Sequence, residues 1–342
     1  MKQEFGYAGS SGINAKYDYR KLGETWSTPR IIRIKVSGKD KWVAVFGGGY
    51  NGAVNPNVGS AVFVMDLEDE GRLLKAIDIV DTSADIVNSL PADLSVITAD
   101  GTNKANYNGA MIYATDLEGK VTKINLTDQG TLYQSTTLFT AESTSANGRY
   151  IYTRPEVTIN NDNNLWLYFG TGNTQKLQAQ SSQVQNRLYG IKDKDFPNFV
   201  TVSSPGDVSK CKTAPTCPRD TDLGWYVNLK KSQKLTAEPT VDKDRVYFPI
   251  YEPTAANNKC GTGIAILMAY DTKCGNSVLN VNMGKGVLSK VVKQGDNLYI
   301  GIAGEANKNI SGFTSKGNLI TGKSKSKAIS GAVQLESWKE NY

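Results

Sequence analysis

The sequence predicts an all-β protein, and three observations carry that prediction. One short hairpin pattern recurs about five times along the chain, which is typical of a β-propeller of four-stranded antiparallel blades. The composition agrees, because 33 glycines and 17 tyrosines among 342 residues favour strands and turns over helices. No window of the sequence shows a long apolar stripe of helical period.

The clearest copy of the hairpin spans residues 153–173, TRPEVTINNDNNLWLYFGTGN. It predicts a strand at 156–159, a polar turn at 160–164 and a second strand at 165–169. β-Branched and aromatic residues flank an Asn/Asp turn, which is the usual hairpin signal. Further copies recur at 26–49, 236–250 and 286–304, with a looser copy at 93–116.

Additional strand-like segments follow each hairpin and complete a blade. They lie at 61–66 and 73–79, 120–125 and 131–137, 187–192 and 199–202, 265–271 and 277–282, and 331–335. A strand is also expected at 13–19. No Pro-rich or Gly/Ser-rich linker divides the chain, so residues 1–342 are predicted to form a single domain. The first copy starts so near Met1 that we expect earlier blades to precede it in a longer protein.

Charge and hydropathy argue against two classes of partner. The formal charge of +6 is spread along the chain, and the Lys-rich segment 316–327 lacks interleaved aromatic residues. A solvated loop therefore explains it better than a nucleic-acid surface. The longest apolar run, residues 264–270, is much too short to span a bilayer. We expect neither nucleic-acid binding nor membrane insertion.

The absence of histidine removes several kinds of chemistry. The chain contains no histidine, so Ser-His-Asp and Cys-His catalysis and the usual zinc ligands are missing. Glycines 47–49 end a predicted strand without opening a helix, whereas a phosphate-binding loop needs that helix. The acidic residues are scattered over turns, so the sequence places no carboxylate pair of the kind that a glycosidase needs.

Four cysteines, Cys211, Cys217, Cys260 and Cys274, allow three disulfide pairings. The two local pairs, Cys211 with Cys217 and Cys260 with Cys274, are the simplest. Neither pair belongs to a zinc-binding pattern, so the cysteines favour disulfides and an oxidising compartment.

One oxygen-rich loop is a candidate calcium site. Residues 100–108, DGTNKANYN, offer Asp100, Asn103, Asn106 and Asn108 as donors, and calcium requires several oxygens that converge on one point. The loop has one carboxylate, so any calcium would bind weakly. An Asx-rich hairpin turn explains the same residues.

Several segments in a fixed order resemble a known family. They are WSTPRIIRI, KWVAVFGGGYNG, VFVMDLEDEGRLL, AMIYATDLEGKVTKINL, LFTA, RPEV, LYFGTGN and ESWKE. Over about residues 6–338 the chain resembles the C-terminal domain of the PilC/PilY family of type IV pilus-associated adhesins. The resemblance implies a modified β-propeller whose earliest blades are missing from this chain. It also implies a secreted virulence protein at the cell surface or pilus, exported through the periplasm and outer membrane.

The family's calcium loop, D-x-[DN]-x-[DN]-G-x-x-D, precedes a Y-x-G-D-L strand. Tyr113-Ala114-Thr115-Asp116-Leu117 matches that strand, but Ala110 stands where the last acidic ligand would fall. By this resemblance Asp100 and Asn103 would fill the early positions, and Asn106 or Asn108 the later ones.

The leading functional prediction is a non-enzymatic binding module. The resemblance implies a role in adhesion to host cells, pilus biogenesis and twitching motility, with pilus components and a host-cell receptor as partners. We expect residues 203–223 to form the recognition surface, with residues 51–58 as second choice. The alternative is a propeller enzyme, either a quinoprotein-like dehydrogenase or a glycan hydrolase. The former commonly has a disulfide between adjacent cysteines, which this chain lacks.

Overall fold

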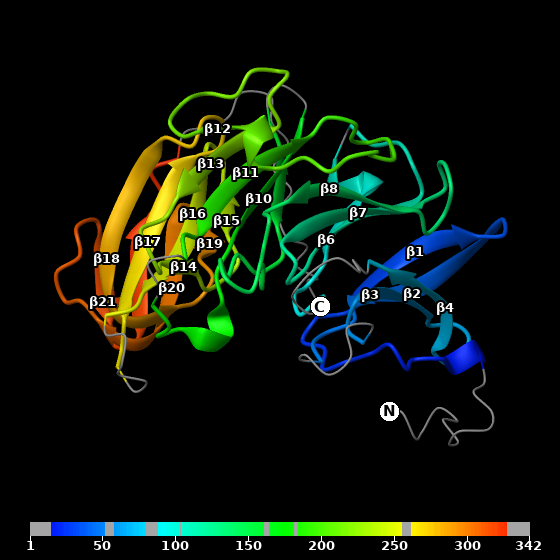
Figure 1. Cartoon of the computed structure of the whole chain (residues 1–342), viewed down its shortest axis with the longest axis horizontal. Helices are drawn as coiled ribbons and strands as arrows, with labels where there is room; N and C mark the ends of the chain where they lie inside the picture. The colour runs from blue at the N-terminus through cyan, green and yellow to red at the C-terminus, as the bar shows by residue number, and fades with distance from the viewer. Residues whose placement is uncertain are drawn as a thin grey trace. The chain divides into compact units, whose positions relative to one another are not determined.

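The computed structural model describes residues 15–51, 58–79, 88–102, 104–160, 164–180, 184–254 and 261–326 (Figure 1). Regular structure within these ranges is almost entirely β, so the predicted fold class is confirmed. Helical structure there consists of short 3₁₀ segments, η1 (Ala15–Tyr17), η2 (Ala99–Gly101), η3 (Thr174–Lys176) and η4 (Val208–Lys210). None of the helices in the described ranges has the length and apolarity needed to cross a membrane.

Contacts group the described residues into two compact units. The first takes residues up to 99, 105–154 and 197–207, and the second takes 100–104, 155–196 and the residues from 208 onward. The chain therefore passes between the units several times. The single domain expected for residues 1–342 stays a prediction.

The first unit contains two four-stranded antiparallel sheets, drawn in blue and cyan in Figure 1. In spatial order they are β1 (Arg30–Val36), β2 (Lys39–Gly47), β3 (Ala61–Asp66) and β4 (Arg72–Asp78), then β5 (Ser95–Thr98), β6 (Gly109–Thr115), β7 (Lys120–Thr127) and β8 (Ser135–Thr140). Strand β8 starts four residues later than the prediction of 131–137. The reason is that the Asn125 side chain donates hydrogen bonds to the carbonyls of Gln129 and Thr131, which holds a wide turn.

Alternation of side chains builds the core of this unit. Ile32 of β1 and Val43 of β2 point toward Ile112 of β6 and Ile124 of β7, and all four are at most 6% exposed. Burying each such side chain contributes about 1.5–3 kcal/mol. The pattern of buried and exposed positions along β1 thus fixes which face of the first sheet packs on the second.

The segment before β1 differs from its prediction as a strand. Residues 15–17 form η1, which contacts the edge strand β4. The Tyr19 hydroxyl donates to the Gly71 carbonyl at 2.7 Å, and Lys16 pairs with Asp69 at 2.7 Å. An edge strand needs such cover, because its unpaired backbone groups invite other strands.

A second prediction, a strand at 199–202, is also wrong. Those residues instead run beside β8 without strand geometry. The Val202 amide donates to the Thr136 hydroxyl at 2.8 Å, and Gly206 exchanges backbone hydrogen bonds with Leu138 and Thr140. Lys123, fully buried, donates to the Asn198 carbonyl at 2.7 Å. The segment 197–207 therefore belongs to the second sheet's edge.

The second unit begins with a five-stranded sheet, drawn in green in Figure 1. Its spatial order is β12 (Cys211–Thr213), β13 (Gly224–Asn228), β11 (Arg187–Asp193), β10 (Leu165–Gly170) and β9 (Glu156–Ile159). The hairpin predicted at 153–173 is confirmed as β9 and β10. Strand β12 runs parallel to β13, and the chain between them makes the long loop discussed below.

The last two blades merge into one nine-stranded sheet. It contains β14 (Lys234–Leu235), β15 (Thr240–Asp242), β16 (Arg245–Glu252), β17 (Ile264–Asp271), β18 (Ser277–Leu288), β19 (Val292–Gln294), β20 (Asn297–Ala306), β21 (Phe313–Lys316) and β22 (Leu319–Lys323). Strand β18 joins the blades, since it pairs with β17 along its first part and with β20 along its last part. Gly286 and Gly304 face each other there at φ +124° and +152°, and a Cβ on either would lie 2.2 Å or less from a carbonyl oxygen. The strand predicted at 331–335 lies outside the described residues.

In three of the sheets, the turn that follows the third strand is held by the same kind of hydrogen bond. Asp66, Asp193 and Asp271 each end a strand, and each accepts the backbone N–H two residues later at 3.0–3.1 Å. Such Asx turns fix the chain direction without a glycine at every position. The third of them carries the candidate site.

Candidate functional site

The disulfide in the second unit joins Cys217 to Cys274, 57 residues apart, with their Cα atoms 4.2 Å apart. The predicted pairs Cys211–Cys217 and Cys260–Cys274 are therefore wrong. Cys211 lies within β12, opposite Gly224, whereas Cys217 lies in the loop after it. Cys260 falls outside the described residues. The bond thus ties the loop between β12 and β13 to the turn between β17 and β18.

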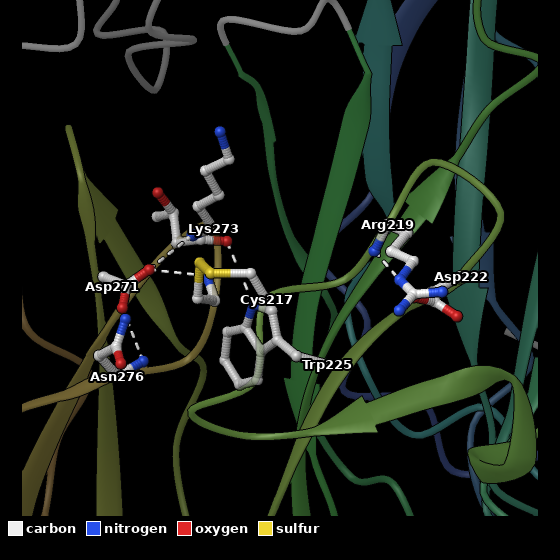
Figure 2. Close-up of a disulfide and its surroundings, with 9 residues drawn as sticks. Cys217, Arg219, Asp222, Trp225, Asp271, Lys273 and Asn276 are labelled. Atoms are coloured by element: carbon white, nitrogen blue, oxygen red, sulfur yellow. Dashed lines mark hydrogen bonds between the residues drawn. A yellow bond between two sulfur atoms is a disulfide. The ribbon is translucent and has the colours of Figure 1, made fainter.

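Trp225 forms the floor beneath this disulfide (Figure 2). It is fully buried and donates its indole N–H to the Thr272 carbonyl at 3.1 Å. Gly275 sits against the ring at φ +72°, and a Cβ there would lie 2.8 Å from the indole. Tyr168 donates its hydroxyl to the same Thr272 carbonyl at 2.9 Å. The aromatic floor therefore requires glycine at 275.

Asp271 holds the turn that presents Cys274. Its carboxylate accepts backbone hydrogen bonds from Lys273 at 3.0 Å, Cys274 at 2.7 Å and Asn276 at 2.6 Å (Figure 2). Three donors on one carboxylate leave this turn little freedom. The disulfide partner on this side is thus held by hydrogen bonds within its own turn.

The far side of the loop is held by other contacts. Lys192, 6% exposed, donates its ammonium to the Arg219 carbonyl at 2.8 Å and lies over the Trp166 ring. Asp222 accepts the Arg219 backbone N–H at 2.8 Å and pairs with Lys212 at 3.4 Å. The hydrogen bond from Arg219, with the charge of Lys212, lowers the pKa of the Asp222 carboxyl. The loop is therefore anchored at both ends.

The outward surface of the loop is polar. Its exposed residues are Pro215, Thr216, Cys217, Arg219, Asp220 and Thr221. This mixture of hydroxyls and both signs of charge suits a wet, polar contact rather than an apolar one. The predicted second surface, residues 51–58, lies largely outside the described residues, which leave out 52–57.

The predicted calcium donors that the structure describes are divided between the two compact units. Asp100 lies in η2 and in the second unit, whereas Asn106 and Asn108 belong to the first. Asn103 lies outside the described residues. The Asn108 backbone and side-chain N–H groups donate to the two Asp128 oxygens at 2.9 and 2.7 Å.

Asp128 is a carboxylate that the sequence argument missed. Burial alone would raise its pKa, but hydrogen bonds, chiefly those from Asn108, and the charge of Lys35 together outweigh burial and lower the pKa. No three His, Cys, Asp or Glu side chains among the described residues come together to hold a metal. The predicted donors are oxygens, as calcium prefers, but they include one carboxylate, so they fit the ion poorly.

A carboxylate pair that the sequence could not place occurs in the second unit. Glu156 is the first residue of β9, and Glu238 lies two residues before β15. The Lys290 ammonium lies 3.4 Å from the Glu156 carboxylate and 3.1 Å from the Glu238 carboxylate. A glycosidase needs water or a sugar between its two carboxylates. Here the ammonium takes that position, so the arrangement ties three strand starts together.

Lys234 is a buried cation of the same unit. It is 2% exposed, and its ammonium donates to the carbonyls of Lys176 at 2.7 Å, Leu177 at 2.8 Å and Ala179 at 3.2 Å. Burial lowers the Lys234 pKa to about 8. The lysine thus fastens the segment that follows β10.

No family model matches the chain. A type IV pilus biogenesis factor PilY1 homolog from Xylella fastidiosa is 26% identical over 295 residues, which are 75% of this chain and 19% of that protein. The chain therefore spans about a fifth of the length of this curated relative.

Among solved structures, the PilY1 C-terminal domain of Pseudomonas aeruginosa superposes with a TM-score of 0.55 at 15% identity. The match covers 84% of this chain and 73% of that domain. The Neurospora crassa Pan2 WD40 domain superposes with a TM-score of 0.36 at 9% identity, over 84% of this chain and 74% of that domain. In sequence and in fold, the chain thus resembles the C-terminal domain of PilY1, as its motifs predicted.

Proposed function

We propose that this chain is a non-enzymatic binding module of a type IV pilus-associated protein. The similarity to PilY1 proteins in sequence and fold supports this proposal. The full protein would act at the cell surface or pilus in adhesion to host cells, pilus biogenesis and twitching motility. Its partners would be pilus components and a host-cell receptor, and a disulfide suits the oxidising route to that location.

The observation that carries the proposal is the anchored loop between β12 and β13. It is fixed by the Cys217–Cys274 bond on one side and by the Lys192 and Asp222 contacts on the other. A loop ordered before contact loses little conformational entropy on binding, which favours affinity. The loop is thus suited to recognition.

Two observations support a binding role over an enzymatic one. The sequence has no histidine for general acid–base work. The ammonium of Lys290 separates Glu156 from Glu238, where a hydrolase would need its substrate.

A substitution that changes the loop's surface alone tests the proposal. The Thr216→Arg/Arg219→Glu variant changes two exposed side chains, whereas the anchoring contacts of Arg219 use its backbone. We expect attachment to host cells or twitching motility to fall by about tenfold, as for a central interface contact. The protein should still be exported and should melt at the same temperature.

A matched control changes the exposed turn of the β21–β22 hairpin, with Lys316→Glu/Asn318→Arg. This control should leave attachment and motility unchanged. If the loop variant and the control behave alike, the recognition surface lies elsewhere. Deletion of residues 203–223 is a poorer test, because it removes β12, Cys217 and half of the segment beside β8.

A further inference from the structure

The first unit contains a buried charged cluster that the proposed function does not use. The turn between β6 and β7 carries Asp116, Glu118 and Lys120, which are 0%, 5% and 8% exposed. The Lys120 ammonium lies 2.5 Å from a Glu118 oxygen and 3.6 Å from Asp116 Oδ2. It also donates to the Ile79 carbonyl at 2.9 Å. Two carboxylates thus share one ammonium.

Polar groups from other segments reach the same place. The Asn88 side-chain N–H donates to the Ile79 carbonyl that Lys120 also binds, at 2.5 Å. The Leu117 amide donates to the Ser89 carbonyl at 3.0 Å, which places Ser89 beside the turn. Ser60 lies next to Ile79, since its carbonyl accepts the Ile79 amide at 3.0 Å.

Several of these groups have an oxygen without a hydrogen-bond partner. They are Asp116 Oδ2, Asn88 Oδ1, Ser89 Oγ and Ser60 Oγ. All four residues are at most 1% exposed. A buried polar oxygen without a partner costs about 1–3 kcal/mol, so four on segments that these hydrogen bonds join are unusual for a native protein.

The charge of the cluster points the same way. Two carboxylates and one ammonium leave one negative charge in a place without solvent, and burying an uncompensated charge is costly. The four unpartnered atoms named above are all oxygens, which is the ligand type that hard cations prefer.

We propose that this cluster is a binding site for a single alkali cation, Na⁺ or K⁺, held by Asp116 Oδ2 and Asn88 Oδ1 together with the Ser60 and Ser89 hydroxyls. One positive charge neutralises the cluster, whereas a divalent ion beside the Lys120 ammonium would leave it positive. The ion would join the β6–β7 turn to the chain around β3 and β4.

Thermal unfolding of the whole chain in different salts tests this proposal. At pH 8 and constant ionic strength, Na⁺ or K⁺ should raise the melting temperature by about 2 °C or more over choline, because an ion that binds the folded state stabilises it. Asp116→Asn should remove this difference. The control Asp78→Asn changes an exposed carboxylate paired with Lys21 and should keep it.

A second variant and a direct measurement cover the case in which Asp116→Asn does not fold. Asn88→Ala retains the charges and removes one ligand, so the half-maximal rise should need about tenfold more cation. Crystals soaked in Rb⁺ should show an anomalous peak beside Asp116.

Three results would overturn the proposal. The first is equal melting in choline and alkali salts, and the second is an alkali-specific rise that survives Asp116→Asn. The third is stabilisation only by Ca²⁺ or only by lowering the pH, which would place a divalent ion or a proton in the cluster.

Discussion

Removal of the Cys217–Cys274 bond by Cys217→Ala/Cys274→Ala should strongly destabilise the second unit. A cross-link between residues 57 apart restricts a long unfolded loop, and the chain-entropy relation gives about 4 kcal/mol at 25 °C. The local pairs expected from the sequence would have contributed about 2–3 kcal/mol each. The long-range bond therefore contributes more than a local one.

Denaturant unfolding under non-reducing conditions measures this loss. The double variant should lose about 4 kcal/mol in the transition of the second unit, while Thr216→Ala, an exposed neighbour in the same loop, should change it by about 0.5 kcal/mol or less. Peptide mapping of the unreduced protein should return the Cys217–Cys274 link. A loss below about 1 kcal/mol, or a mapped link between Cys211 and Cys217, would refute this reasoning.

Three further predictions follow from the second unit and its neighbouring loop. Gly275→Ala should lower the free energy of unfolding by about 2–4 kcal/mol, because the new Cβ would collide with Trp225 and the backbone has a strained φ. The control Gly317→Ala has φ +58° and nothing within 4 Å of the new Cβ, so it should lose about 1 kcal/mol from the strain alone. Equal losses would contradict the packing argument. Burial lowers the Lys234 pKa to about 8, so between pH 8 and about 10.5 the unfolded chain binds more protons than the folded chain does. The free energy of unfolding should therefore rise with pH across this window by up to about 3 kcal/mol. Lys234→Met should flatten the rise. If the stability of the wild-type protein fell between pH 8 and about 10.5, burial would not be what controls the pKa of Lys234. Calorimetry should show calcium binding no tighter than about millimolar, lost in Asp100→Ala, and submicromolar binding that survives this change would place the site elsewhere.

The hairpins were predictable because they depend on local chemistry. The segment 153–173 carries its strands, its polar turn and its closing glycines within one short stretch, and the structure forms β9 and β10 there. Similar local signals located β3 and β4 to within one residue. Fold class followed from the repetition of such units.

The misses have a common physical cause, which is contact with distant parts of the chain. Residues 199–202 look like a strand, but they satisfy their backbone groups partly through side chains of β8. Cys217 pairs across 57 residues because the Asp271 turn presents Cys274 over Trp225, and no spacing rule contains that information. The buried oxygens around Asp116 were equally hidden, since they come from three separate segments of the chain.

The dependence of β8 on residues 197–207 also constrains the order in which the parts of the chain can fold. A chain grows from its N-terminus and folds as it appears. The second sheet would have its four strands by Thr140, yet the segment that covers its edge appears only after β9, β10 and β11 have been made. The sheet must therefore wait with an open edge during synthesis, and a fragment that ends before residue 197 keeps that edge open permanently. We expect such a fragment to aggregate. A fragment extended through residue 207 contains the segment that covers the edge of β8 and should aggregate less.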